Sequence, residues 1–174
     1  FRNEMRAKSG LLRGMEFLAD GTLVYGIRSH GGSWIAGTGA ARKRHFQSLN
    51  QFKVSPDKRH WGYIGLEKNR RVEKLYLDGH EAVLPQKDLR IFSFQFDLMG
   101  NAAVTAKNEA GEWVVFYRGK KYGPYYAVHS IQEFQFSPDF DHMAFHVYDG
   151  YGQQYWVVDG VVQPAFESAH DFIF

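Results

Sequence analysis

Apolar and aromatic residues recur along the chain in short alternating runs that end in a turn, and the same run returns at regular intervals. The clearest pair is Phe134-Gln-Phe-Ser-Pro-Asp139 and Phe52-Lys-Val-Ser-Pro-Asp57. Looser copies begin at Met15 and Phe94, and a last copy begins at Phe172. Successive starts are 37 to 42 residues apart, close to the ~40–45 residues per unit of repeat proteins built from four-stranded sheets. The pattern predicts a β-repeat protein.

A second marker keeps the same phase and strengthens the repeat. Leu75–Gly79, Val115–Gly119 and Trp156–Gly160 each combine an apolar run with a final glycine, and they follow the repeat starts by 23, 21 and 22 residues. Trp34–Gly37 is a shorter counterpart in the first repeat. Glycine after a polar residue is typical of the tight turn between two antiparallel strands.

The repeat that begins at Phe134 predicts four strands separated by turns. Pro138-Asp139, Asp149–Gly152 and Asp159-Gly160 are turn sequences. Pro164 is tolerable in an outer strand, which has one unpaired edge. The expected strands are Glu133–Ser137, His142–Tyr148, Gln154–Val158 and Val161–Phe166.

We therefore expect an all-β chain, a β-propeller segment of about four four-stranded blades that is part of a larger ring. One such sheet cannot bury both faces alone, so neighbouring blades must stack. Residues 1–14 would end a preceding blade and 172–174 would begin a following one. The expected repeats span residues 15–51, 52–93, 94–133 and 134–171.

The repeat resembles a known family. Phe136-Ser-Pro-Asp139, followed by Met143-Ala-Phe145 and Val157-Val-Asp-Gly160, is similar to the WD40-like repeat of TolB-type bacterial propellers. The first and third repeats depart from this string, with Leu18-Ala-Asp20 and Asp97-Leu-Met99 in its place. The resemblance implies a binding platform in the bacterial cell envelope. It carries over no catalytic residue, because the motif residues of that family are structural.

Composition narrows the candidate chemistry. The chain is 44% hydrophobic and 17% aromatic, which favours stacked strands. Its net charge is only +2, so no strong overall field attracts nucleic acid or anionic lipid. It has no cysteine, which excludes disulfides and thiolate chemistry. No apolar run approaches the roughly 18 residues of a membrane-spanning helix, so membrane insertion is not expected.

Two side-chain pairs suggest chemistry and are better explained by structure. His142 and His146 have a spacing that on a helix starts a zinc site, but on a strand they lie about 13 Å apart. Asp139 belongs to the repeated turn, so we expect it to cap local backbone rather than to form an acid–base pair with Asp141. The serine motif of α/β-hydrolases is also missing. We expect no catalytic, metal-binding or cofactor-binding residue.

Three loop features remain. The basic stretches Arg42–His45 and Lys68–Arg71 are expected in solvated inter-strand loops, because acidic residues lie nearby in sequence. Gly37–Gly39 is expected in a loop and lacks the full dinucleotide fingerprint. Loops that lead into the innermost strands gather at one mouth of a propeller channel. That position makes three residues the candidate ligand-binding residues, Arg90, His129 and His170.

The sequence thus favours a non-enzymatic propeller scaffold that binds a protein or peptide, with a periplasmic or cell-envelope location expected and a cytoplasmic one left open. A first alternative is the propeller domain of a larger enzyme, such as a prolyl-oligopeptidase-type peptidase. A second is a structural module that completes its ring by self-association. Nucleic acid is not an expected partner.

Overall fold

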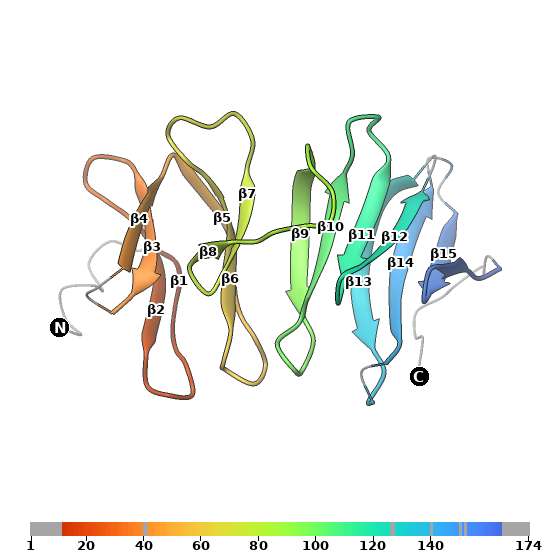
Figure 1. Ribbon diagram of the computed structural model, residues 1–174, viewed down its shortest axis with the longest axis horizontal. Helices are drawn as coiled ribbons and strands as arrows, with labels where there is room; N and C mark the ends of the chain where they lie inside the picture. Colours follow the sequence, from red (N-terminus) through yellow and green to blue (C-terminus); the bar gives the residue numbers. More distant parts are fainter. Residues whose placement is uncertain are drawn as a thin grey trace. The chain divides into compact units, whose positions relative to one another are not determined.

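The structure is a computed structural model that describes residues 12–39, 42–125, 128–139, 141–149, 151 and 153–164, without the side chains of 42, 43, 128–133, 148 and 149. These residues form sixteen β-strands and no helix (Figure 1). They fall into two compact units, residues 1–83 and residues 84–174, each with two four-stranded antiparallel sheets. The prediction of an all-β chain with four-stranded sheets is confirmed, although no described sheet closes into a ring.

In the first unit, each sheet contains four consecutive strands that lie side by side in chain order. The first sheet comprises β1 (Leu12–Phe17), β2 (Leu23–Arg28), β3 (Trp34–Thr38) and β4 (Arg42–Phe46). The second comprises β5 (Ser48–Val54), β6 (Trp61–Leu66), β7 (Lys74–Leu77) and β8 (His80–Glu81).

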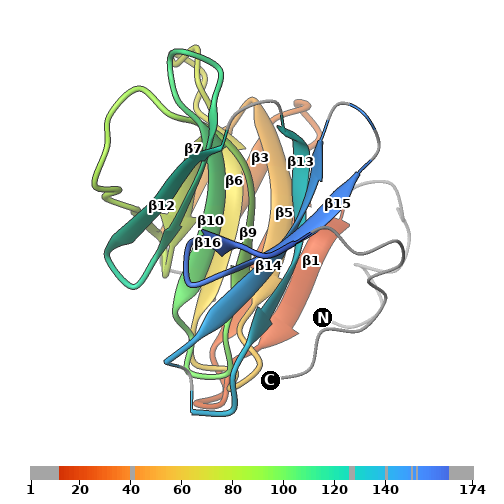
Figure 2. The same cartoon turned by 90° about the vertical axis from the view of Figure 1, so that its right-hand side faces the viewer.

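The second unit repeats this topology. The third sheet comprises β9 (Arg90–Phe96), β10 (Ala102–Lys107), β11 (Trp113–Tyr117) and β12 (Lys120–Tyr125). The fourth comprises β13 (Val128–Phe136), β14 (Met143–Asp149), β15 (Gln154–Val158) and β16 (Val161–Val162). Figure 2 turns the fourth sheet toward the viewer.

The strands expected from the repeat at Phe134 agree in part with this sheet. The first strand, expected over Glu133–Ser137, is β13 and begins five residues earlier, at Val128. β15 has the predicted bounds, and β14 begins one residue later than predicted, at Met143. The fourth strand is shorter than predicted, because Pro164 has no N–H with which to extend the pairing. Residues 1–14 and 172–174 were expected to belong to neighbouring blades. Residues 1–11 and 172–174 lie outside the described residues, whereas Leu12–Gly14 belong to β1 of the first sheet, which corrects that part of the prediction.

The expected turn between the third and fourth strands is confirmed in three sheets. Asp78-Gly79, Arg118-Gly119 and Asp159-Gly160 all have positive φ at both residues, with values of 48–51° at the first and 74–90° at the glycine. Two successive positive φ values define the type I′ turn that matches the twist of paired strands. Glycine is favoured at the second position because it lacks a Cβ.

Two of the three loop predictions are wrong. Gly37–Gly39 was expected in a loop, but Gly37 and Thr38 are the last residues of strand β3. Arg42–His45 was expected in a solvated loop, and the structure places it in strand β4, paired with β3 from Thr38↔Arg42 to Trp34↔Phe46. The charged sequence hides the strand because β4 is the outer strand of its sheet, where side chains reach solvent. Its anchor is the buried Phe46. The loop prediction for Lys68–Arg71, between β6 and β7, is confirmed.

Aromatic packing joins the two sheets of the first unit. Phe46 from β4 meets the rings of Tyr63 and Tyr76 edge-on, with centroids 5.3 and 5.1 Å away. Gly14 and Gly26 make room on the first sheet for Phe52 of the second, since a Cβ at Gly14 would lie only 2.3 Å from the Phe52 ring. The buried residues of this core are Val24, Ala36, Phe46, Leu49, Trp61, Tyr63 and Tyr76.

The second unit has an equivalent core between its two sheets. The third sheet contributes Ala103, Trp113, Val115 and Tyr117, and the fourth contributes Phe134, Met143, Phe145, Val147 and Val157. In both units, therefore, the second sheet packs one face on the first sheet of the same unit, and that face is buried.

Candidate binding surface

The Ser-Pro-Asp turn is a hydrogen-bonded network rather than a reactive centre. Ser137 Oγ donates to Asp139 Oδ1 at 2.5 Å and accepts from the His142 backbone N–H at 3.0 Å. Asp139 Oδ1 also accepts from the backbone N–H of Asp141, which confirms the predicted turn role of Asp139. The second sheet has the same bonds with Ser55, Asp57 and His60.

A histidine–aspartate pair completes each network. His142 Nδ1 lies 2.6 Å from Asp159 Oδ2, and the other oxygen of that carboxylate accepts from the Met143 N–H at 3.0 Å. His60 and Asp78 form the equivalent pair at 2.8 Å in the second sheet. Serine, histidine and aspartate therefore share one turn, but the serine proton goes to Asp139, whereas a catalytic triad needs it directed to the histidine ring. The arrangement fastens the first hairpin of the sheet to its last turn.

The pair predicts a pH-dependent turn. The hydrogen bond to Asp159 and the negative charge of that carboxylate raise the pKa of His142 above its ordinary 6.5. Burial raises the pKa of Asp159, but hydrogen bonds from His142 and Met143 outweigh it and the pKa is lowered. The charged pair therefore stabilises the turn fully between the ordinary aspartate pKa of 3.8 and the ordinary histidine pKa of 6.5. The contribution is lost as pH rises through the raised pKa of His142 or falls through the lowered pKa of Asp159.

NMR titration of the His142 ring checks this prediction. We expect an apparent pKa above 6.5 in the wild-type chain and a return toward 6.5 in Asp159→Asn. The control is Asp20→Asn in the first sheet, which should leave the titration of His142 unchanged. An unchanged His142 titration in Asp159→Asn would contradict the pairing.

The third sheet replaces this network with one buried carboxylate. Asp97 is 1% exposed and accepts hydrogen bonds, each 2.8 Å long, from the backbone N–H groups of Met99 and Asn101, the Asn101 side chain and the Tyr117 hydroxyl. Burial, followed by the hydrogen bond to Asp97, raises the pKa of Tyr117. Every oxygen of Asp97 is thus engaged in holding the turn, which gives this carboxylate a structural role.

The two histidines with zinc-like spacing have separate surroundings. His142 lies in the exposed turn, whereas His146 is buried in β14 and stacks on Trp156 with centroids 5.1 Å apart. Among the described residues, no three His, Asp or Glu side chains gather as a metal-binding group.

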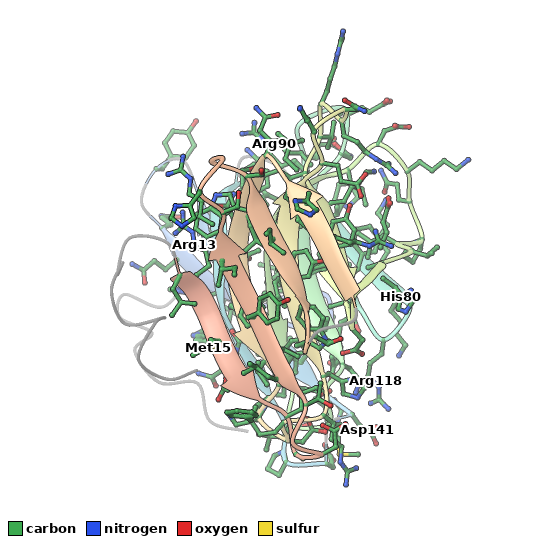
Figure 3. All side chains as sticks on the ribbon, turned by 90° about the vertical axis from the view of Figure 1, so that its left-hand side faces the viewer. Arg13, Met15, His80, Arg90, Arg118 and Asp141 are labelled. Atoms are coloured by element: carbon green, nitrogen blue, oxygen red, sulfur yellow. The ribbon has the colours of Figure 1, made fainter. Side chains whose placement is uncertain are left out.

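The three predicted ligand-binding residues are only partly placed. Arg90, which is labelled in Figure 3, is the first residue of β9 rather than a loop residue. Its guanidinium lies 5.0 Å from the centroid of the Phe92 ring. His129 lies in β13 with its side chain outside the described part, and His170 lies outside the described residues. A shared site for the three residues stays a prediction.

The first sheet has an exposed apolar face, which we name the open face. Leu12, Met15 and Phe17 of β1 are 49%, 42% and 63% exposed, and Figure 3 views this end of the first sheet with Met15 labelled. By register, Phe17 stands opposite Leu23 and Met15 opposite Tyr25, so the apolar face continues onto β2, where Leu23 is partly exposed and Tyr25 is buried. The register pair Ile27↔Ile35 extends it to β3.

Register shows what the open face corresponds to in the other sheets. Phe17↔Leu23 closes the first hairpin of its sheet as Phe136↔Met143 does in the fourth. Met143 and its neighbours on the same face of the fourth sheet are buried against the third sheet. In the second sheet, the face with Phe52 packs on the first sheet. The open face is thus the counterpart of two faces that are buried against a preceding sheet.

The structure also brings together the two basic stretches that the sequence suggested separately. Arg44 of β4 lies 3.7 Å from Glu67, at the start of the β6–β7 loop, and its guanidinium lies 5.4 Å from the Tyr76 ring centroid. Glu67 also pairs with Arg70 at 3.1 Å. We name β4 and residues 67–74 together the basic edge. No sequence pattern marks this surface, because its two halves lie some twenty residues apart along the chain.

Comparison with known proteins does not assign the chain to a family. No protein-family model matches the chain, and no curated protein matches its sequence. Within the described residues, no helix has the length and apolar character needed to cross a membrane. The resemblance to WD40-like repeats therefore stays a prediction from the repeat itself.

Proposed function

We propose that the chain is a non-enzymatic β-propeller scaffold that binds another protein through the open face of its first sheet. The main support is strand register. The open face occupies the same position in the first sheet as the faces that are buried in the second and fourth sheets. Exposed apolar surface of this kind marks interaction sites in soluble proteins. The location implied by the resemblance, the bacterial cell envelope, is part of the proposal.

The contacts inside the first unit indicate what the partner must look like. Phe52 fits against Gly14 and Gly26, where a Cβ would approach its ring to 2.3 and 3.2 Å. Met15 occupies the position in the first repeat that Phe52 occupies in the second. The expected partner surface is therefore a β-sheet with glycine or alanine opposite Met15 and Phe17.

A separate protein fits this surface better than a second copy of the chain. Head-to-tail association of copies needs a free face on the last sheet, and there Ala144, His146 and Trp156 are at most 2% exposed. The corresponding face of the first sheet is occupied by the second sheet. We therefore favour a separate protein over ring completion by self-association, the structural alternative, for which Val161 is the largely exposed apolar residue, at 64%, on that face of the last sheet.

Site-specific photo-cross-linking tests the proposal. A photoreactive phenylalanine analogue at Phe17, in the cells that make the protein, should form one discrete adduct with a different protein. The same analogue at Tyr151, which is 91% exposed, should not form it. Met15→Lys should abolish the adduct, because a buried unpaired ammonium is costly. Equal labelling at both positions would contradict the proposal, and an adduct with a second copy would favour the structural alternative.

A further inference from the structure

The outer strand β4 has a regular free edge. It pairs with β3 through five consecutive residue pairs without a register shift, and no described strand pairs with its other side. The other edge strands are less suited to pairing. β8 and β16 have two residues each, β12 contains a register shift and Pro124, and β1, β5, β9 and β13 each pair with their neighbour through a register shift. An unpaired strand edge presents N–H and C=O groups that accept a further strand.

The basic edge carries a strong local excess of positive charge. Residues 42–46 and 67–74 contain seven Lys and Arg residues and two Glu residues, although the whole chain has a net charge of only +2. Both glutamates are engaged. Glu67 pairs with Arg44 and Arg70, while Glu73 accepts hydrogen bonds from Ser48 and Asn50.

Part of this charge has no counterpart in the molecule. No ion pair joins Lys68, Arg71 or Lys74 to an acidic side chain among the described residues, whereas Arg70 also reaches Glu81 at 3.3 Å. Charged residues on an edge strand discourage edge-to-edge pairing. That role explains charges in β4 itself, but Lys68 and Arg71 lie in the β6–β7 loop and protect no edge.

We propose that an extended acidic peptide segment of another protein binds the basic edge by adding to β4 as a fifth strand. Its backbone pairs with the free side of β4, and alternate carboxylates face Arg44 and the surplus cations Lys68 and Arg71. This inference deepens the proposed scaffold role and rests on it, while placing a second contact away from the open face. Arginine is well suited to the task because its planar fork matches a carboxylate.

A peptide fits this surface better than a nucleic acid. The charges of a duplex recur every ~1.7 Å along its axis. Glu67 and Glu73 of the basic edge, and Glu81 of β8, which pairs with Arg70, would repel part of that continuous charge. A strand places its side chains on each face only at every second residue, about 6.6–6.8 Å apart. Carboxylates on one face of the peptide can therefore pair with the cations, while apolar residues occupy the other face.

Fluorescence anisotropy with three synthetic peptides tests the inference. The probe is a short labelled peptide of alternating glutamate and valine. The first comparison peptide has glutamine in place of glutamate, and the second keeps glutamate but has N-methylated backbone positions that cannot donate to β4. We expect the glutamate peptide to bind at least about tenfold more tightly than either comparison peptide. Its affinity should fall as the salt concentration increases.

Charge reversal locates the site on the protein. The double variant Lys68→Glu with Arg71→Glu should bind the glutamate peptide about tenfold more weakly than wild type. The control double variant, Lys120→Glu with Lys121→Glu on the exposed β12, should bind it as wild type does. The double variant Met15→Lys with Phe17→Lys should leave peptide binding intact. The experiment therefore separates failure of the proposed function at the open face from failure of peptide binding at the basic edge. Equal binding of the three peptides, an unaffected charge-reversal variant, or tighter binding of a single-stranded oligonucleotide would each overturn the inference.

Discussion

Replacing Phe46 with alanine is expected to lower the free energy of unfolding by about 3–5 kcal/mol, the usual range for removing a buried aromatic ring. Phe46 is 1% exposed and touches Tyr63 and Tyr76, so its loss leaves a cavity between the two sheets of the first unit. Gly65 closes one side of this pocket, because a Cβ there would lie 2.8 Å from the Phe46 ring. The cavity cannot collapse without moving strands.

Denaturant unfolding followed by tryptophan fluorescence measures this effect. The matched control is Phe17→Ala, which removes the same ring from a position that is 63% exposed and should cost less than about 1 kcal/mol. If the two variants were equally stable, Phe46 would not join the sheets and the core of the first unit would be wrong.

Removing the carboxylate of Asp97 is expected to be the second large effect, about 3 kcal/mol or more for Asp97→Ala. The substitution leaves the Tyr117 hydroxyl, the Asn101 amide and two backbone N–H groups without their acceptor. Tyr117 is itself buried, so water cannot replace the lost bond. Asp97→Asn, which keeps one carbonyl oxygen, should be intermediate.

Thermal and denaturant unfolding of four chains check this prediction. The four chains form a double-mutant cycle of wild type, Asp97→Ala, Tyr117→Phe and the double variant. The double variant should lose less free energy of unfolding than the two single variants lose together. Asp139→Ala, in the exposed turn of the fourth sheet, is the control and should cost only about 1 kcal/mol. Additive losses in the cycle would show that Asp97 and Tyr117 do not interact.

The strands were predictable where repetition and turn chemistry coincided. The Ser-Pro-Asp strings and the glycine turns each mark a place where the backbone needs a specific local hydrogen bond or a positive φ. Such requirements are met by few residue types and are therefore visible in one sequence. The third repeat lacks the string, and Asp97 alone accepts the backbone hydrogen bonds that serine and aspartate accept together in the second and fourth repeats.

The outer strand and the candidate surfaces were harder to predict. β4 is held by the buried Phe46, and its Arg44 and His45 side chains are exposed, so its sequence lacks the apolar alternation of a half-buried strand. The basic edge depends on contacts between β4 and the β6–β7 loop that only the packing of two sheets creates. Arg90 was placed in a loop because strand starts are poorly marked, and it begins β9 instead.

The most direct test of the scaffold account is an experimental structure of the chain with the protein captured at Phe17. The account predicts a β-sheet of that protein lying on Leu12, Met15 and Phe17, with small residues opposite the Met15 and Phe17 side chains. A captured protein that contacts the chain elsewhere and leaves the open face in solvent would contradict the account.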